Sequence, residues 1–264
     1  MKKIGLISGE GRLPLLLYKK LLEEGERVVV VGLREFPPQD LHPHHWVKLG
    51  EMGKLLSILE KENIQDIILA GKVEKIEILR YHEWDEIARE ILEKAEDRRD
   101  SSLLEALRNY FETRGFSFPP LEKYLSSWLA GSGKLTQREP RRDEKKDLAL
   151  AWKVGRRLAE MDVGHTVVVR GGVVTAVETL EGTDETIKRG GRWGENGGVA
   201  KVPRPHQDLR WDPPVVGINT LRVMSRVQIK ALVVGSGKTL LLDKENFLKE
   251  ADRLNIAILG WECE

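Results

Sequence analysis

The first third of the chain alternates short apolar runs with helical patterns, and this alternation limits the possible folds more than any other feature. Residues 2–8, 27–33 and 64–73 are typical of buried strands, while residues 13–25 and 52–63 between them have the spacing of amphipathic helices. A helix between two strands is the crossover that joins parallel neighbours. The sequence therefore predicts an N-terminal α/β domain built on a parallel, Rossmann-like sheet.

The remainder of the chain is predicted to form a second α/β domain. Residues 131–147 contain glycine and then many charges with few apolar side chains, which is typical of a linker. Beyond them we expect a long helix, a hairpin that turns at Gly171 and Gly172, and further strands. The expected organisation is a domain over 1–130, a linker over 131–147 and a C-terminal α/β domain over 148–264.

Composition argues against several classes of protein. The 43 basic and 42 acidic residues give a formal net charge of +1, so no overall basic character favours a nucleic-acid partner. Cys263 is the only cysteine and cannot form an internal disulfide, which favours a reducing, cytoplasmic setting. No apolar run approaches the ~18 residues that cross a bilayer. We therefore expect a cytoplasmic protein that does not bind nucleic acid.

Two stretches imitate known motifs without meeting their requirements. The run GSGKT at 235–239 lacks the first glycine of a phosphate-binding loop, because Leu232 stands there, and an apolar strand pattern follows it. We expect a hairpin turn between two strands. The run HPHHW at 42–46 has adjacent histidines on a proline-broken loop, with no further ligand at metal-site spacing. A solvated loop is the better interpretation.

Glycines gather at the predicted carboxyl ends of the first and third strands. Gly9, Glu10 and Gly11 occupy the first strand-to-helix turn, and Gly71 and Lys72 end the third strand. Ligands of open parallel sheets bind beyond these strand ends, where glycine allows close approach of the backbone. These residues are candidates for substrate binding. The alternative is that the glycines only form tight turns.

Acids and bases gather in the second half of the chain. His206, Asp208, Arg210 and Asp212 fall at every second position between prolines, a spacing that points extended side chains to one side. Carboxylates hold a hard cation, while lysine and arginine pair with phosphate oxygens. The alternative interpretation is a helix cap followed by a solvated charged loop. The further members of this group are Glu178, Glu181, Thr183, Asp184, Glu185, Lys201 and Arg204.

Over nearly its full length the chain resembles the LpxI family of UDP-2,3-diacylglucosamine pyrophosphatases of lipid A biosynthesis. No single matching piece is a widespread motif, so their order along the chain carries the resemblance. The pieces are GLISGEGRLP, LGEMGKLLSIL, LAGKV, DVGHTVVVRGGVVTAVETLEGTDETI, KVPRPHQDLRWDPPVVGINT and LNIAILGW.

The resemblance implies a magnesium-dependent enzyme with substrate held between two domains, in a homodimer. Water attacks the β-phosphorus of UDP-2,3-diacylglucosamine, releasing UMP and 2,3-diacylglucosamine 1-phosphate, which is lipid X. The family's essential aspartate lies in an arginine-x-aspartate-x-proline element, which gives Asp212 that role here. The catalytic candidates are Asp212, Asp208 and Arg210. The metal candidates are Asp212, Asp208, Glu181 and Asp184. The substrate-binding candidates are Gly9, Glu10, Gly11, Gly71, Lys72, Thr183, Lys201, Arg204 and Gln207.

Several points stay open at the level of sequence. Asp212 is either a metal ligand or a general base, and a different pair among the four candidate acids can hold the ion. Because the substrate carries acyl chains, we expect a cytoplasmic enzyme that docks transiently on the inner face of the inner membrane. Two other functions remain open. One is a hydrolase or transferase acting on a soluble nucleotide sugar, and the other is a non-catalytic nucleotide- or lipid-binding protein.

Overall fold

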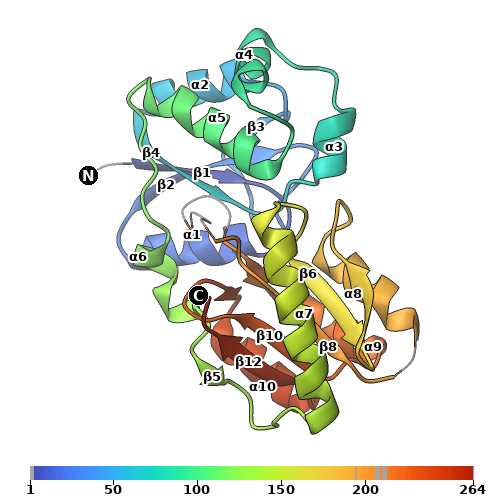
Figure 1. The fold of residues 1–264 in the computed structure, drawn as a ribbon. Coiled ribbons are helices and arrows are strands. Elements are labelled where there is room, and N and C mark those ends of the chain that lie inside the picture. Colours follow the sequence, from blue (N-terminus) through green and yellow to red (C-terminus); the bar gives the residue numbers. More distant parts are fainter. Residues whose placement is uncertain (1–2, 194, 206–208, 210–212, 264) are drawn as a thin grey trace. The chain divides into compact units, whose positions relative to one another are not determined.

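The computed structural model describes residues 3–193, 195–205, 209 and 213–263. By its internal contacts the chain divides between Tyr124 and Leu125 into an N-terminal unit and a C-terminal unit. Each unit has its own sheet and its own core (Figure 1). The expected class, two α/β domains, is confirmed.

The sheet of the N-terminal unit is parallel throughout, as the alternating pattern predicts. Its strands are β1 (Lys3–Ser8), β2 (Arg27–Leu33), β3 (His45–Val47) and β4 (Ile64–Ala70), in the order β3-β2-β1-β4. The chain therefore proceeds outward from β1 to β3 and then returns to the other side of β1. Such a reversal is where open parallel sheets place their ligands.

The first two helices of this unit each bury an apolar stripe. The helix α1 (Leu13–Glu23) buries Leu17 and Leu21 completely, and α2 (Met52–Lys61) buries Leu55 and Leu59. The remaining helices described in this unit are α3 (Lys75–Arg80), α4 (Glu86–Lys94), α5 (Asp100–Glu112) and α6 (Glu122–Leu125). Strand β3 was not predicted, because its three residues follow a proline-containing loop.

Close backbone contact joins the loops after β1 and β4. Gly9 N donates to Ala70 O at 2.8 Å, Glu10 N to Lys72 O at 2.9 Å, and Lys72 N to Glu10 O at 2.8 Å. A Cβ atom on Gly9 would lie 2.7 Å from Lys72 O, and one on Gly71 would lie 2.6 Å from the carbonyl of Gly9. These two glycines are therefore required by the approach of one loop to the other.

The C-terminal unit contains a mixed six-stranded sheet in the order β5-β12-β10-β8-β6-β7. Strands β8, β10 and β12 are parallel to one another, while β5, β6 and β7 pair antiparallel with their neighbours. Their bounds are β5 (Gly133–Lys134), β6 (Thr166–Arg170), β7 (Val173–Val177), β8 (Gly198–Lys201), β10 (Ala231–Gly235) and β12 (Ala257–Trp261). The hairpin between β6 and β7 turns at Gly171 and Gly172, both at positive φ, as predicted.

The central strands β6, β8 and β10 are buried on both faces, so helices pack on both sides of the sheet. Val167, Val169 and Val233 pack with Leu148 and Trp152 of the long helix on one face. The opposite face packs against the other three helices (Figure 1). These four helices are α7 (Arg142–Glu160), α8 (Thr183–Gly190), α9 (Ile218–Arg226) and α10 (Lys244–Arg253), and short 3-10 turns lie at η1 (Ser126–Trp128) and η2 (Gly191–Trp193).

The segment predicted as a linker, residues 131–147, differs from that expectation, since it belongs to the C-terminal unit. Strand β5 pairs with β12, and α7 begins at Arg142. The charges are ordered because they are paired: Arg138 Nη2 donates to both carboxylate oxygens of buried Glu144 at 2.7 Å. Glu144 also accepts from Arg141 N at 2.7 Å and so caps α7.

The two motif-like stretches form local structure. GSGKT is a turn in which Gly235 N donates to Thr239 Oγ1 at 3.1 Å. The hairpin expected there is wrong, because β11 (Leu240–Leu241) pairs in parallel with β9 (Val215–Val216) in a separate small sheet. The expectation of a solvated loop at 42–46 is also wrong in part: His44 Nδ1 accepts from Val30 N at 2.9 Å, and His45 begins β3. Among the described residues, no helix has the length and apolar character needed to span a membrane.

We predict that Gly71→Ala destabilises the protein far more than Gly25→Ala. Both glycines have positive φ, at +100° and +78°, but only Gly71 would bring its Cβ against backbone atoms. Backbone strain alone costs ~1 kcal/mol, and the overlap at Gly71 adds a further ~1–3 kcal/mol. Urea denaturation of the two variants measures the difference. Equal losses of unfolding free energy would contradict the role given to this contact.

Candidate functional site

One edge of the C-terminal sheet collects polar side chains from several strands. The parallel strands β8, β10 and β12 all end there. The antiparallel neighbour β6 begins at the same edge, since Thr166 pairs with Lys201, and β7 ends there. Residues just before β6 and just after β7 and β8 are therefore brought together. This edge, defined by His165, Thr166, Glu178, Lys201 and Arg204, is called the polar edge below.

Lys201 and Glu178 form a buried ion pair at the polar edge. Both residues are only 8% exposed. The Lys201 ammonium lies 3.3 Å from Glu178 Oε2 and donates to Thr183 Oγ1 at 2.7 Å. Thr183 begins α8 and in turn donates to Glu178 Oε1 at 3.1 Å. The hydroxyl of Thr166 completes the group by donating to Thr183 Oγ1 at 3.2 Å.

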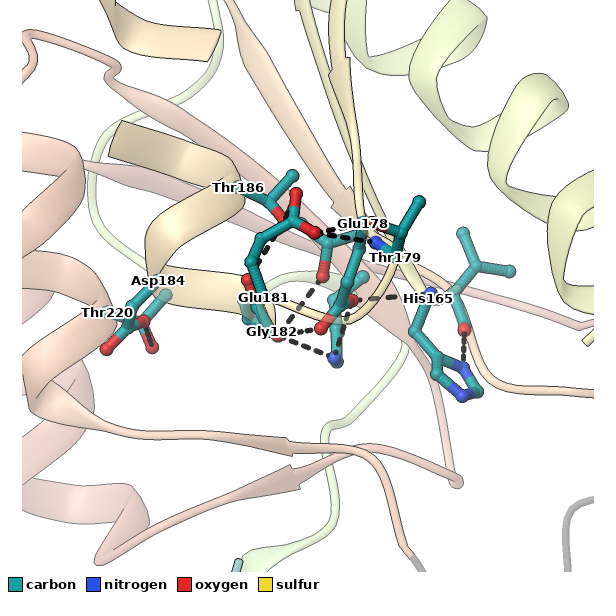
Figure 2. Close-up of polar contacts among 12 residues, drawn as sticks. His165, Glu178, Thr179, Glu181, Gly182, Asp184, Thr186 and Thr220 are labelled. Atoms are coloured by element: carbon teal, nitrogen blue, oxygen red, sulfur yellow. Dashed lines mark hydrogen bonds and ion pairs between the residues drawn. The ribbon is translucent and has the colours of Figure 1, made fainter. Parts of the chain in front are cut away.

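Glu178 is ionised in this environment. Burial acts to raise the pKa of Glu178, but the positive charge of Lys201 and its contact with the carboxylate act in the opposite direction, and the pKa lies below its ordinary value. The carboxylate also accepts from His165 N at 3.3 Å (Figure 2). Glu178 thus joins the beginning of β6, the end of β8 and the beginning of α8.

His165 is a neutral hydrogen-bonding group. Its Nδ1 lies 3.0 Å from Val202 O, and because a carbonyl only accepts, Nδ1 carries the proton and Nε2 presents a lone pair. Burial lowers the pKa of His165 to about 4, with the charges of Lys201 and Arg204 adding to the effect. At neutral pH the polar edge therefore offers a hydrogen-bond acceptor beside its cations.

Arg204 supplies the second buried cation of the polar edge. The residue is 8% exposed, and its Nη1 donates to Asp162 Oδ1 at 2.8 Å. Asp162 has positive φ in the turn between α7 and β6, so the pair fastens this turn to the chain that leaves β8. The structure thus brings Lys201 and Arg204, both candidates for substrate binding, to one edge of the sheet.

Glu181 and Asp184, proposed as metal ligands, each hold helix α8 in place (Figure 2). The Glu181 carboxylate accepts hydrogen bonds from the hydroxyls of Thr179 at 2.6 Å and Thr186 at 3.1 Å. It also forms an ion pair with Arg189. Partial burial acts to raise its pKa, but these hydrogen bonds outweigh burial and lower the pKa to about 2. Asp184 accepts from Asn219 and, at 2.7 Å, from Thr220, which ties α8 to α9.

No metal centre is formed within the described part of the chain, where groups of three or more potential ligands among His, Cys, Asp and Glu are absent. Glu181 and Asp184 are occupied by neighbouring donors and do not make such a group. The catalytic candidates Asp208, Arg210 and Asp212, and the substrate candidate Gln207, lie outside the described residues.

The candidates in the N-terminal unit form a local assembly of their own. The main-chain N–H groups of Gly9, Glu10 and Lys72 are used in the hydrogen bonds between the two loops. The Lys72 ammonium lies 2.8 Å from Glu74 in an exposed pair, and Gly11 has a φ of +97°. The alternative interpretation, glycines required by tight turns and close approach, therefore explains Gly9 and Gly71 fully. Their place at the reversal between β1 and β4 keeps them candidates for a ligand.

Sequence reasoning missed His165 and Thr166 of the polar edge and also Asp162, the partner of Arg204, and it gave Glu178 no role. His165 directly precedes β6, and Asp162 lies in the preceding turn. Glu178 follows β7 and was seen only as part of an acidic run. The missing signal was antiparallel pairing, which places the start of β6 beside the end of β8. The available signal was that polar residues, His165 and Glu178, flank the two open ends of the predicted hairpin.

The polar edge has the chemistry needed to bind an anionic ligand that also carries hydroxyl groups. Two buried cations, a neutral histidine acceptor and threonine hydroxyls converge at the end of parallel strands, where α/β proteins bind ligands. Each cation is balanced by a carboxylate, so the edge is stable without a ligand. These features define a two-unit α/β protein with paired buried cations at the carboxyl ends of its parallel strands.

Comparison with known proteins gives the family. The family model described as LpxI N-terminal domain matches residues 3–128, and the one described as LpxI C-terminal domain matches residues 131–259. The UDP-2,3-diacylglucosamine pyrophosphatase LpxI of Caulobacter vibrioides is 31% identical over 274 residues, covering 98% of each chain. The chain therefore belongs to the LpxI family, and the resemblance found in its sequence is confirmed.

We predict that acid weakens the folded state through His165 between pH 6.5 and about 4. In this range the unfolded chain binds a proton at His165 and the folded protein does not, so the free energy of unfolding falls as the pH falls. The loss amounts to at most ~3 kcal/mol. The free energy of unfolding, measured by urea denaturation at pH 7 and at pH 5, should differ less between the two pH values for His165→Gln than for the parent.

The exposed His82 provides the control for this experiment. For His82→Gln, the free energy of unfolding should fall between pH 7 and pH 5 by the same amount as for the parent. If it also falls by that amount for His165→Gln, the neutral state of His165 is contradicted.

Proposed function

We propose that this protein hydrolyses the pyrophosphate of UDP-2,3-diacylglucosamine, releasing UMP and 2,3-diacylglucosamine 1-phosphate in lipid A biosynthesis. The observation that carries the proposal is the match to the Caulobacter enzyme over 98% of both chains, with both LpxI domain models in order. The polar edge supports it because Lys201 and Arg204 suit a pyrophosphate, and His165 suits a sugar hydroxyl.

In this proposal the protein acts by positioning and charge neutralisation, without a covalent intermediate. Water adds to the β-phosphorus, the bond from that phosphorus to the bridging oxygen breaks, and UMP leaves with the bridging oxygen. Lys201 and Arg204 offset the negative charge on the phosphate oxygens as it is redistributed. Asp212 orients the water or ligates the ion, with Asp208 and Arg210 beside it in sequence. Gln207, Thr183 and the glycine loop of the N-terminal unit complete the proposed substrate contacts.

Magnesium dependence is part of the proposal and rests on the family resemblance. Asp208 and Asp212 are the acids proposed to hold the ion, because Glu181 and Asp184 already accept hydrogen bonds within the C-terminal unit. A bound Mg²⁺ would supply charge neutralisation at the pyrophosphate oxygens.

The chemistry of the substrate sets the proposed location and partners. A diacylated sugar nucleotide resides in a membrane, so we propose a cytoplasmic enzyme that docks transiently on the inner face of the inner membrane. We also propose a homodimer. A soluble nucleotide sugar as substrate and a non-catalytic carrier are the competing functions, and the experiments below separate them.

We predict that the parent protein converts UDP-2,3-diacylglucosamine to UMP and 2,3-diacylglucosamine 1-phosphate, and that Asp212→Asn lowers kcat by at least ~100-fold. The reaction in ¹⁸O-labelled water should place the label on the sugar phosphate, as detected by mass spectrometry, because attack is at the β-phosphorus. Label in UMP would contradict that site of attack. Hydrolysis of UDP-sugars without acyl chains at a similar rate would favour the soluble substrate. Tight binding without turnover would favour the carrier.

We predict that removal of divalent cations with EDTA abolishes hydrolysis and that added Mg²⁺ restores it. If Asp208 and Asp212 hold the ion, Asp212→Asn should raise the Mg²⁺ concentration needed for half-maximal rate, whereas Glu181→Gln should not. Activity that persists in EDTA would overturn the proposed metal dependence. If only Glu181→Gln raises the Mg²⁺ concentration needed for half-maximal rate, Glu181 and not Asp212 would be assigned as a metal ligand.

A further inference from the structure

The Lys201 ammonium keeps one donor for a ligand. An ammonium has three N–H donors. Thr183 Oγ1 accepts one at 2.7 Å and Glu178 Oε2 accepts another at 3.3 Å, and no described residue accepts the third. The side chain is nonetheless only 9% exposed, so the position of its nitrogen is set by these partners and not by solvent. A partly used, fixed cation suits the recognition of a phosphate oxygen.

Glu178 is the residue that fixes this arrangement. One carboxylate oxygen accepts from Thr183 at 3.1 Å, and the other accepts from His165 N at 3.3 Å and faces Lys201 (Figure 2). Glu178 thus contacts the ammonium directly and also orients Thr183, the other group that holds it. Its main chain is equally constrained, since Glu178 N donates to Thr166 O at 2.8 Å.

A second buried ion pair in the same unit has a different geometry and serves as a comparison. Arg138 and Glu144 make two hydrogen bonds of 2.7 Å, and Arg138 also donates to Lys230 O at 2.9 Å, just before β10. That pair lies at the opposite edge of the sheet, because Lys230 precedes the strand that ends at the polar edge. The Lys201–Glu178 contact is longer and single. A buried charge pair is costly, and a long one adds little stability to offset that cost.

We propose that Glu178 is a positioning residue, which holds the Lys201 ammonium ready for a phosphate oxygen of the substrate. This inference rests on the proposed function for the identity of the substrate. Glu178 does not contact the reacting atoms and acts through Lys201 and Thr183. The acidic run that follows β7 therefore contains one residue that serves substrate recognition, while Glu181 and Asp184 hold α8.

A double-mutant cycle tests the proposal. Glu178→Gln should lower kcat/KM by ~10- to 100-fold, mainly through KM, because the ammonium is no longer held in position. Lys201→Met should lower kcat/KM at least as far, through loss of a charged hydrogen bond. If Glu178 acts through Lys201, the double variant should be no worse than Lys201→Met, within about twofold. The double variant also removes both buried charges together, so it leaves no unpaired buried charge that would prevent folding.

Glu144→Gln is the matched control, since it removes a buried carboxylate from an ion pair at the other edge. We expect it to lower the midpoint of urea denaturation and to leave kcat and KM unchanged. The proposal is overturned if Glu178→Gln keeps the parent's kcat/KM. It is also overturned if the losses of kcat/KM from Glu178→Gln and Lys201→Met are fully additive in the double variant, or if Glu144→Gln lowers kcat/KM as much as Glu178→Gln does.

UDP binding separates this inference from the proposed function. Calorimetric titration with UDP needs no turnover, so it is informative even if the parent hydrolyses nothing. Glu178→Gln and Lys201→Met should each weaken UDP binding by ~10-fold or more, and the double variant should weaken it no further. Parent-like affinity in Glu178→Gln would overturn the positioning role, whatever the reaction is.

Discussion

Parallel strands end at the same edge of a sheet, and the chemistry of this protein depends on that constraint. In the C-terminal unit it brings the ends of β8, β10 and β12 together, and the antiparallel pairing of β6 adds His165 and Thr166 to the same edge. In the N-terminal unit it brings the loops after β1 and β4 into contact. Residues separated by many positions in the chain become neighbours without any long loop having to reach across the fold.

The C-terminal unit also buries several cations, each paired with a carboxylate. Lys201, Arg204 and Arg138 are largely removed from water, and each has its own carboxylate in Glu178, Asp162 or Glu144. Such pairing is required, because an unpaired buried ion is far more costly than a paired one. The pairs differ in geometry, however. The Arg138 pair, with two hydrogen bonds, closes the start of α7, while the single, longer Lys201 contact leaves one ammonium donor that no described residue accepts.

The glycine-rich loops of the N-terminal unit illustrate how one pattern can serve two purposes. Glycine at positions 9 and 71 is explained by contact between the loops, which uses the N–H groups that a phosphate would otherwise receive. The same contact lies at the reversal of strand order, where ligands of parallel sheets bind. Recognition of a nucleotide or sugar there would depend on groups beyond these main-chain donors.

The sequence by itself determined the class of the fold and the family. Alternating strands and helices require parallel pairing, the Gly171–Gly172 turn defines a hairpin, and ordered motifs along the whole chain identify the LpxI family. Local charge density misled the prediction of a linker over 131–147, because partners such as Arg138 and Glu144 neutralise each other only after folding. Only the tertiary structure decided which acids are neighbours. It separated Glu178, which meets Lys201 across β6, from Glu181 and Asp184, which hold helices. The physical reason is that strand pairing and burial act between residues far apart in sequence, and no local pattern records them.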